Sequence, residues 1–241
     1  MKFRSLSLAA LAATASAQVK VMLLGDSITE ITCWRPLVWE QLTSAGIAGN
    51  VDFVGSMNDL QGCSAPSGFD RDHEGHSGWQ VYDIARNNIA GWVQNTKPDI
   101  VQFMLGTNDV NIGKRDATSI LGSFELLITA IRNANPNAKI IVDKLIPTSW
   151  SDATVEAVNT ALPNWVAQHT TTESPIAIAD CSRAAGFTNA MLRSDGVHPN
   201  DQGDQFIAKA VGPQLITFIN DVLGASASSG GSTSRRNRRR L

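Results

Sequence analysis

Long hydrophobic runs are missing from this chain of 241 residues. The apolar stretch near its N-terminus covers only about ten residues, whereas a helix that spans a bilayer needs about 20. The sequence also has no phosphate-binding loop, no dinucleotide-binding glycine motif and no Asn-x-Ser/Thr acceptor for N-glycosylation. These absences argue against a membrane protein and give no support to a nucleotide or other organic cofactor.

Basic residues are scarce over most of the chain. Five of the 20 are arginines within the last seven residues, and Lys2 and Arg4 stand at the other end. Residues 18–223 therefore hold 13 basic side chains against 22 acidic ones. Because a surface with this charge repels a phosphate backbone, we do not expect a nucleic-acid partner.

Both ends of the chain differ in composition from its middle. The first 17 residues combine Lys2 and Arg4, an apolar stretch and a final Ala-Ser-Ala, which is the pattern of a secretory signal peptide. Residues 224–241 are rich in Ser, Gly and Arg and predict a disordered tail. We therefore expect a secreted, extracellular protein with one domain over residues 18–223, monomeric by default.

The sequence has only three cysteines, and an odd number leaves one thiol unpaired. Since an oxidising compartment permits disulfides, we expect Cys33 to pair with Cys63 and to fasten a long loop beside the first helix. Cys181 follows an apolar strand and is expected to be a free, buried thiol. Sequence alone does not determine the pairing, so three reduced cysteines remain the alternative.

Five short apolar runs alternate with five longer stretches of helical spacing. The strand-like runs are residues 19–24, 51–55, 99–105, 139–143 and 176–180. Alternation of this kind predicts βαβ units, and therefore an α/β fold with a five-stranded parallel sheet covered on both faces. In such a sheet, ligands bind beyond the carboxyl ends of the strands.

Polar clusters stand where those strands end. Ser27 follows the first strand, and a serine hydroxyl becomes a useful nucleophile when a base accepts its proton. His198 lies in a Gly/Pro-containing turn before the last helix, and Asp195, three residues earlier, can orient its imidazole. Ester hydrolysis also needs donors for an oxyanion: the backbone N–H of Ser27, the side chain of Asn108 after the third strand, and the backbone N–H of Gly78.

Other motifs have weaker chemical interpretations. The stretch His-Glu-Gly-His at residues 73–76 has the wrong spacing for a helical zinc site, so no metal is expected. Ser77 is a poor nucleophile candidate because it follows a loop and is not at the end of a buried strand. Most of the six tryptophans suit the core, whereas Trp34 and Trp79 could offer flat faces to sugar rings.

Four blocks give the chain a specific resemblance. They are GDSI (25–28), the glycine of HSGW (76–79), GTND (106–109) and DGVHPN (195–200). In order and approximate spacing, they resemble the four blocks of the SGNH (GDSL-like) hydrolase superfamily. Ile28 stands where the eponymous motif has leucine, which is a conservative departure.

The resemblance implies a fold and a set of roles. The fold would be a flavodoxin-like, three-layer α/β/α sandwich, in agreement with the strand pattern. The family's conserved Ser, Gly, Asn and His would be Ser27, Gly78, Asn108 and His198, with Asp195 completing a catalytic triad.

Longer stretches resemble one branch of that superfamily. GDSITEITCWR, FVGS, DHEGHSGW and LGTNDV are similar to acetylxylan esterases of carbohydrate esterase family 3. This resemblance implies a secreted serine esterase that releases acetate from O-acetylated xylan or a related plant polysaccharide through an acetyl-serine intermediate, without a cofactor. The alternatives are a general short-acyl or lipid esterase of the same superfamily, or a carbohydrate-binding protein without turnover.

Overall fold

The computed structural model describes residues 18–234, with side chains up to residue 226. The predicted signal peptide at 1–17 and the arginine-rich end at 235–241 lie outside the described residues.

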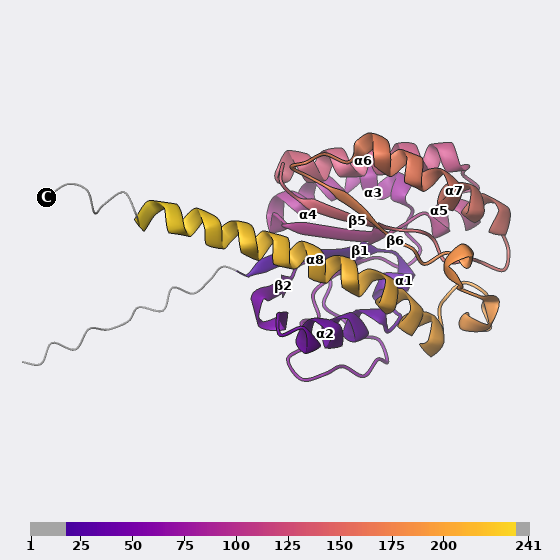
Figure 1. Ribbon diagram of the computed structural model, residues 1–241. Helices are drawn as coiled ribbons and strands as arrows, with labels where there is room; N and C mark the ends of the chain where they lie inside the picture. The colour runs from indigo at the N-terminus through magenta and orange to yellow at the C-terminus, as the bar shows by residue number, and fades with distance from the viewer. Residues whose placement is uncertain (1–17, 235–241) are drawn as a thin grey trace, which may run out of the picture.

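The centre of the molecule is a parallel sheet (Figure 1). Its main path runs β2-β1-β4-β5-β6, and every strand pair is parallel. The strands are β1 (Val19–Gly25), β2 (Val51–Phe53), β3 (Glu74–Gly75), β4 (Ile100–Met104), β5 (Lys139–Asp143) and β6 (Ile176–Ala179). All five predicted strands are present, and β3 is an additional strand of two residues.

β3 lengthens the edge of the sheet beyond the end of β2. β2 pairs with the first half of β1, and β3 then pairs with Leu24 and Gly25 at the end of β1. A Glu-Gly dipeptide carries no apolar pattern, so the sequence could not predict this strand. Its effect is to bring the loop after it to the carboxyl edge of the sheet.

Helices cover both faces of the sheet, which confirms the three-layer α/β/α fold. In Figure 1, α3, α4, α6 and α7 lie on one face, and α2 and α8 lie on the other. The helices are α1 (Ser27–Glu30), α2 (Trp34–Ser44), α3 (Val81–Asn87), α4 (Ile89–Thr96), α5 (Thr107–Asn111), α6 (Ala117–Ala134), α7 (Asp152–His169) and α8 (Asp201–Ser234). Because both faces are covered, β4 is buried over its whole length and β1 is almost so.

α8 is the one described helix that is long and apolar enough to cross a membrane, over residues 201–226. Its apolar side chains Ile207, Val211, Leu215 and Ile219 are fully or almost fully buried in the core, and the helix packs against α2 and the sheet. A core helix of this kind satisfies the same length and composition test. The fold therefore accounts for its hydrophobicity.

α8 also continues beyond residue 223, where we expected the domain to end. It runs through residues 224–234, so this part of the predicted disordered tail is helical in the structure. Extending an established helix costs little free energy, because each added residue loses its conformational freedom but forms one new backbone hydrogen bond. The predicted disordered tail is therefore helical up to Ser234 in the structure.

Candidate active site

Ser27 lies at the junction between β1 and α1, at the carboxyl edge of the sheet. Asp26 caps the helix, and its side chain accepts the N–H of Ile28 at 2.9 Å. A Cβ added at Gly25 would stand 2.1 Å from the Thr29 hydroxyl oxygen, so only glycine allows this tight junction. The Ser27 side chain is held at the rim of the fold, with 9% of the residue exposed.

His198 and Asp195 reach Ser27 from the other end of the chain. The Ser27 hydroxyl oxygen lies 2.8 Å from His198 Nε2, and His198 Nδ1 lies 2.9 Å from Asp195 Oδ2. An ionised carboxylate can only accept, so Nδ1 carries the imidazole proton and Nε2 is free to accept the proton of Ser27. The three residues thus form one hydrogen-bonded series.

The turn that carries His198 is held by its own hydrogen bonds. Asp195 Oδ1 accepts the backbone N–H groups of Val197 and His198, both at 2.9 Å. Gly196 has φ +71°, a conformation that favours glycine, and its carbonyl accepts the N–H of Ser149 at 2.9 Å. These contacts fix the orientation of the imidazole before any substrate binds.

The two acidic groups of the site have opposite electrostatic environments. Partial burial raises the pKa of Asp195, but the backbone donors and the His198 ring outweigh this effect and hold that pKa below its ordinary value. Asp26 is buried beside Asp109, and burial raises the pKa of Asp26 to about 7. Asp195 is therefore ionised at neutral pH, whereas Asp26 titrates near neutrality.

Asn108 and Gly78 lie on the side of Ser27 formed by α5 and by the turn before α3. Asn108 Nδ2 donates to the Trp79 carbonyl at 3.0 Å and to Asp26 Oδ2 at 3.4 Å, which links the turn to the serine junction. Gly78 has φ +82°, and a Cβ there would meet no atom within 4 Å. Within residues 18–226, neither Ser27 N–H nor Gly78 N–H donates to a protein acceptor.

Asp109 fixes the turn in place. Its carboxylate accepts the N–H groups of Val81 and Tyr82 at 2.8 and 3.0 Å, at the start of α3. Asp109 follows Asn108 directly, so one short helix both presents the amide and anchors the segment that it faces. We did not assign a role to Asp109 from the sequence, although its place in GTND was a usable signal.

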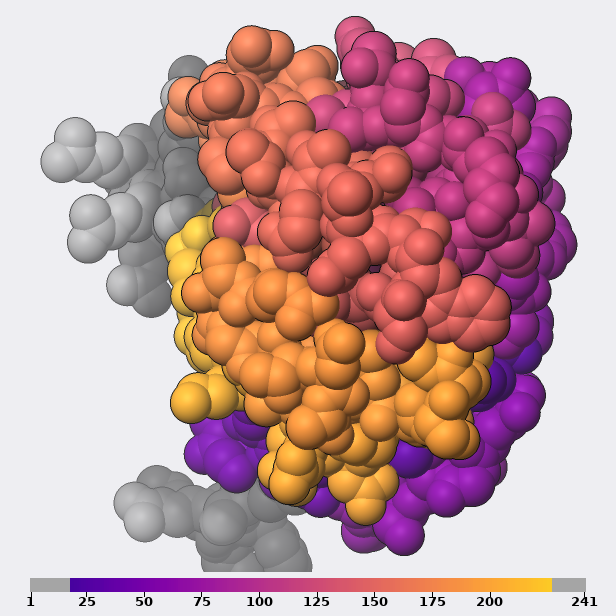
Figure 2. Space-filling view, turned by 90° about the vertical axis from the view of Figure 1, so that its right-hand side faces the viewer, coloured from indigo at the N-terminus to yellow at the C-terminus, as the bar shows by residue number. Residues whose placement is uncertain are grey.

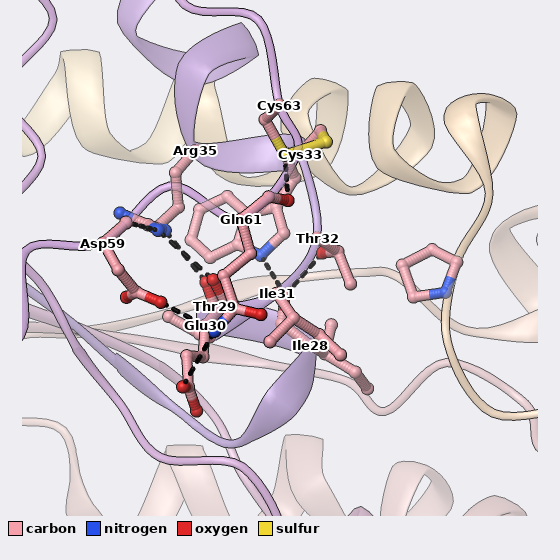
Figure 3. Close-up of a disulfide and its surroundings, with 12 residues drawn as sticks. Ile28, Thr29, Glu30, Ile31, Thr32, Cys33, Arg35, Asp59, Gln61 and Cys63 are labelled. Carbon is pink, nitrogen blue, oxygen red and sulfur yellow. Dashed lines mark hydrogen bonds between the residues drawn. A yellow bond between two sulfur atoms is a disulfide. The ribbon is translucent and has the colours of Figure 1, made fainter.

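The loop between β2 and β3 is fastened by a disulfide. Cys33 and Cys63 are bonded, with their Cα atoms 5.5 Å apart (Figure 3), and Cys181 is free and buried. Both sequence predictions about the cysteines are confirmed. The bond joins the start of α2, close behind Ser27, to the middle of the loop.

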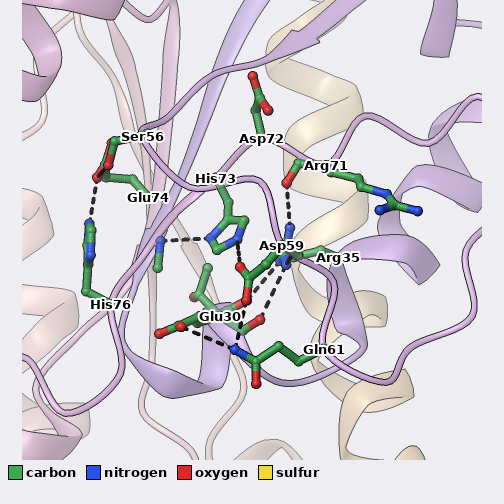
Figure 4. A network of polar contacts seen from close by, with 12 residues as sticks. Glu30, Arg35, Ser56, Asp59, Gln61, Arg71, Asp72, His73, Glu74 and His76 are labelled. Carbon is green, nitrogen blue, oxygen red and sulfur yellow. Dashed lines mark hydrogen bonds and ion pairs between the residues drawn. The ribbon is translucent and has the colours of Figure 1, made fainter.

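A fully buried arginine holds the same loop from inside. Arg35 donates to the carbonyl groups of Thr29, Arg71 and Asp59 at 2.8, 3.1 and 3.0 Å. Figure 4 shows its guanidinium pointing into the ring of loop residues that surround it. Burial lowers the pKa of Arg35 to about 10, which still leaves it charged at neutral pH. Three hydrogen bonds to backbone carbonyl groups therefore join the loop and α1 to this one side chain.

Two carboxylates complete the support of the loop. Asp59 lies 2.8 Å from Nε2 of the buried His73 (Figure 4). Glu30, from the last position of α1, accepts the backbone N–H of Ser77. The second contact ties the residue before Gly78 to the helix that begins with Ser27. Neither carboxylate was expected to act at the site, because the sequence does not show which backbone groups lie opposite them.

The two tryptophans expected to contact sugars differ in the structure. Trp34 is only 1% exposed, and its indole N–H donates to the Ile28 carbonyl at 2.9 Å, so it cannot offer a face to a sugar. Trp34 is a core residue, and that part of the prediction is wrong. Trp79 is 39% exposed, and its ring stacks on His76, which in turn stacks on Trp92.

With this geometry established, comparison with known proteins identifies the family. A model described as the GDSL-like Lipase/Acylhydrolase family matches residues 23–206. The chain belongs to this family. It is a carboxylic ester hydrolase, and the resemblance predicted from the four sequence blocks is confirmed.

Solved structures place this GDSL-like hydrolase among carbohydrate esterases. A carbohydrate esterase of family 3 from Talaromyces cellulolyticus is 78% identical, with a TM-score of 0.84 over 85% of this chain and 99% of that one. A serine-to-alanine mutant of an acetyl esterase, solved with an acetate ion, has the same identity and TM-score and is covered over 100% of its length. A family 3 carbohydrate esterase from Clostridium thermocellum is 29% identical, with a TM-score of 0.70 over 85% and 98% of the two chains. None of the curated proteins matches the chain.

Proposed function

We propose that this GDSL-like hydrolase is a secreted esterase that releases acetate from O-acetylated xylan or a related plant polysaccharide. The observation that carries the proposal is the series Ser27–His198–Asp195, closed by hydrogen bonds of 2.8 and 2.9 Å at the carboxyl edge of the sheet. The acetyl and carbohydrate esterases that match at 78% identity support the choice of acyl group and of substrate class. The disulfide is in keeping with an oxidising compartment.

The first half of the reaction forms an acetyl-serine. His198 takes the proton of Ser27 as the hydroxyl oxygen attacks the acetyl carbonyl, and Asp195 stabilises the imidazolium that results. The negative charge that develops on the carbonyl oxygen is met by the N–H groups of Ser27 and Gly78 and by the amide of Asn108. Of the two hydrogen bonds that Asn108 donates, the one to Asp26 is longer. The N–H group of this longer bond turns from Asp26 to the oxyanion and donates a hydrogen bond to it.

The tetrahedral intermediate then collapses: His198 gives its proton to the sugar oxygen, the C–O bond breaks, the deacetylated sugar leaves and the acetyl-serine remains. In the second half, His198 takes a proton from water as the water oxygen attacks the acetyl-serine. His198 returns this proton to the Ser27 oxygen, the bond between that oxygen and the acetyl carbon breaks, and acetate departs. Each step uses only side chains and backbone groups of this chain, together with water.

The test is acetate release from acetylated xylan by residues 18–241, with Ser27→Ala in parallel and a long-chain aryl ester as a comparison substrate. We expect acetate release that disappears in Ser27→Ala, with little activity on the long-chain ester. Ser27-dependent activity on the aryl ester alone would favour a general or lipid esterase. No Ser27-dependent activity on either substrate would favour a carbohydrate-binding protein without turnover.

A further inference from the structure

Trp150 is an exposed indole beside the catalytic turn. At 71% exposure, it is the most exposed large hydrophobic residue among residues 18–226. A Cβ added at Gly196 would lie 2.9 Å from Trp150 Nε1, so the indole reaches the residue next to Asp195. The N–H of Ser149 also donates to the Gly196 carbonyl. Figure 2 shows this face, where the salmon chain around residue 150 borders the orange chain of the 180s and 190s.

The segment that carries Trp150 is anchored in the fold. Leu145 and Ile146 are buried after β5, and the buried side chain of Asn159 on α7 binds both the N–H and the carbonyl of Leu145 at 2.8 Å. Thr148 is buried as well. The exposed indole is therefore presented from a fixed base and is not at the tip of a long loop. A fixed aromatic surface can bind a ligand without a large cost in conformational entropy.

The positions of the leaving group and of the oxyanion decide which part of the substrate would contact Trp150. His198 must protonate the leaving oxygen, so the sugar that carries this oxygen lies on the His198 side of Ser27. The oxyanion donors come from a different part of the fold: Gly78 stands in the turn before α3, and Asn108 on α5 is linked to that turn through the Trp79 carbonyl. Trp150 is attached to the turn of His198 and is therefore on the leaving-group side. Trp79 is linked through its carbonyl to Asn108, on the oxyanion side.

We propose that Trp150 is a sugar-binding residue of this esterase, which packs against the apolar face of the sugar unit that is being deacetylated. The inference rests on the proposed function, because it requires a carbohydrate leaving group. The apolar face of a sugar ring matches an indole in size, and contacts between such flat surfaces contribute modest binding energy. Trp150 would select the substrate, whereas the chemistry would remain with Ser27, His198 and Asp195.

The test compares kcat/KM for an acetylated xylo-oligosaccharide with kcat/KM for ethyl acetate, whose leaving group has no ring. In Trp150→Ala, we expect the ratio of the two values to fall about five- to tenfold, chiefly through a higher KM for the sugar substrate. Trp150→Phe should recover most of the ratio. Leu126→Ala, which removes another exposed apolar side chain on the outer face of α6, should leave the ratio unchanged.

Two results would overturn the inference. An equal loss on both substrates would mean that Trp150 supports the catalytic turn and does not bind sugar. An unchanged ratio would mean that the indole does not touch the leaving group. Failure of the proposed function looks different, because the unmodified enzyme would then hydrolyse ethyl acetate but release no acetate from the oligosaccharide.

Discussion

The disulfide between Cys33 and Cys63 is expected to make a large contribution to stability. Its two cysteines are 30 residues apart, and closing a loop of that length in the unfolded chain stabilises the folded state by about 3.6 kcal/mol in the chain-entropy treatment. For a domain of this size, each 1 kcal/mol changes the midpoint of thermal unfolding by about 2–4 °C. The double variant Cys33→Ser/Cys63→Ser should therefore unfold about 7–14 °C lower than the parent protein.

The buried contacts of Arg35 and His73 remain in that variant, so the loop should still fold at low temperature. The assay is thermal unfolding followed by circular dichroism, with and without a thiol reductant. The parent protein should lose a similar number of degrees on full reduction, and the double variant should not respond. Cys181→Ala keeps the disulfide and should respond to reductant as the parent does.

A double variant that unfolds within about 2 °C of the parent would refute the reasoning. It would show that residual structure already restricts this loop in the unfolded chain, or that the bond strains the folded state by as much as it stabilises it. A parent midpoint that is unmoved by complete reduction would have the same meaning.

Three further substitutions test the site. Asn108→Ala should lower kcat by roughly 10²–10³-fold, the effect typical of losing one oxyanion donor. A loss of less than tenfold in initial-rate assays would show that Asn108 is not an oxyanion donor. Gly196→Ala places a Cβ 2.5 Å from Ser149 Oγ, at a residue whose φ of +71° disfavours a side chain. The substitution should therefore displace the catalytic turn and lower kcat at least about tenfold. An unchanged kcat together with an unchanged unfolding midpoint would contradict this. The pKa of Asp26 is about 7 in the fold against an ordinary 3.8, so its stabilising contribution is complete below about pH 4 and is lost as the pH rises through 7. Asp26→Asn should flatten the decline in unfolding midpoint between these values, and parallel curves for the two proteins would show that Asp26 does not titrate there.

Much of the site could be predicted from the sequence because it depends on strand ends. Ser27 and Asn108 each follow a buried apolar run, and parallel strands bring their carboxyl ends to one edge of the sheet. His198 was recognisable from its turn and from Asp195 three residues earlier. The distance of 171 positions between Ser27 and His198 therefore presented no obstacle.

The support of the site was not predictable in the same way. Arg35 follows Trp34, and neither residue type reveals that both are buried. The donors of Arg35 find one carbonyl group on α1, six positions before it, and two on the loop, 24 and 36 positions after it, where the sequence has no periodic pattern. Trp34 adjoins a functional block in sequence, but its side chain points into the core. Adjacency in sequence was a poor guide to adjacency at the surface.

Trp150 shows the converse limitation. No role was predicted for Trp150, because a single aromatic residue in a polar stretch has no pattern from which exposure can be read. Only the packing of the segment after β5 against the turn of Gly196 places it beside the site. Contacts between two loops depend on the folded geometry of both, which local sequence does not contain.

The central claim is that Ser27 is the nucleophile and carries the acetyl group during turnover. The most direct measurement is mass spectrometry of peptides from enzyme that has been mixed with an acetyl ester and quenched in acid within the first turnovers. The account predicts a mass increase of one acetyl group on the peptide that contains Ser27, absent in Ser27→Ala and longer-lived in a His198→Ala background. Acetate release by Ser27→Ala at the parent rate, or an acetyl group on another residue, would contradict it.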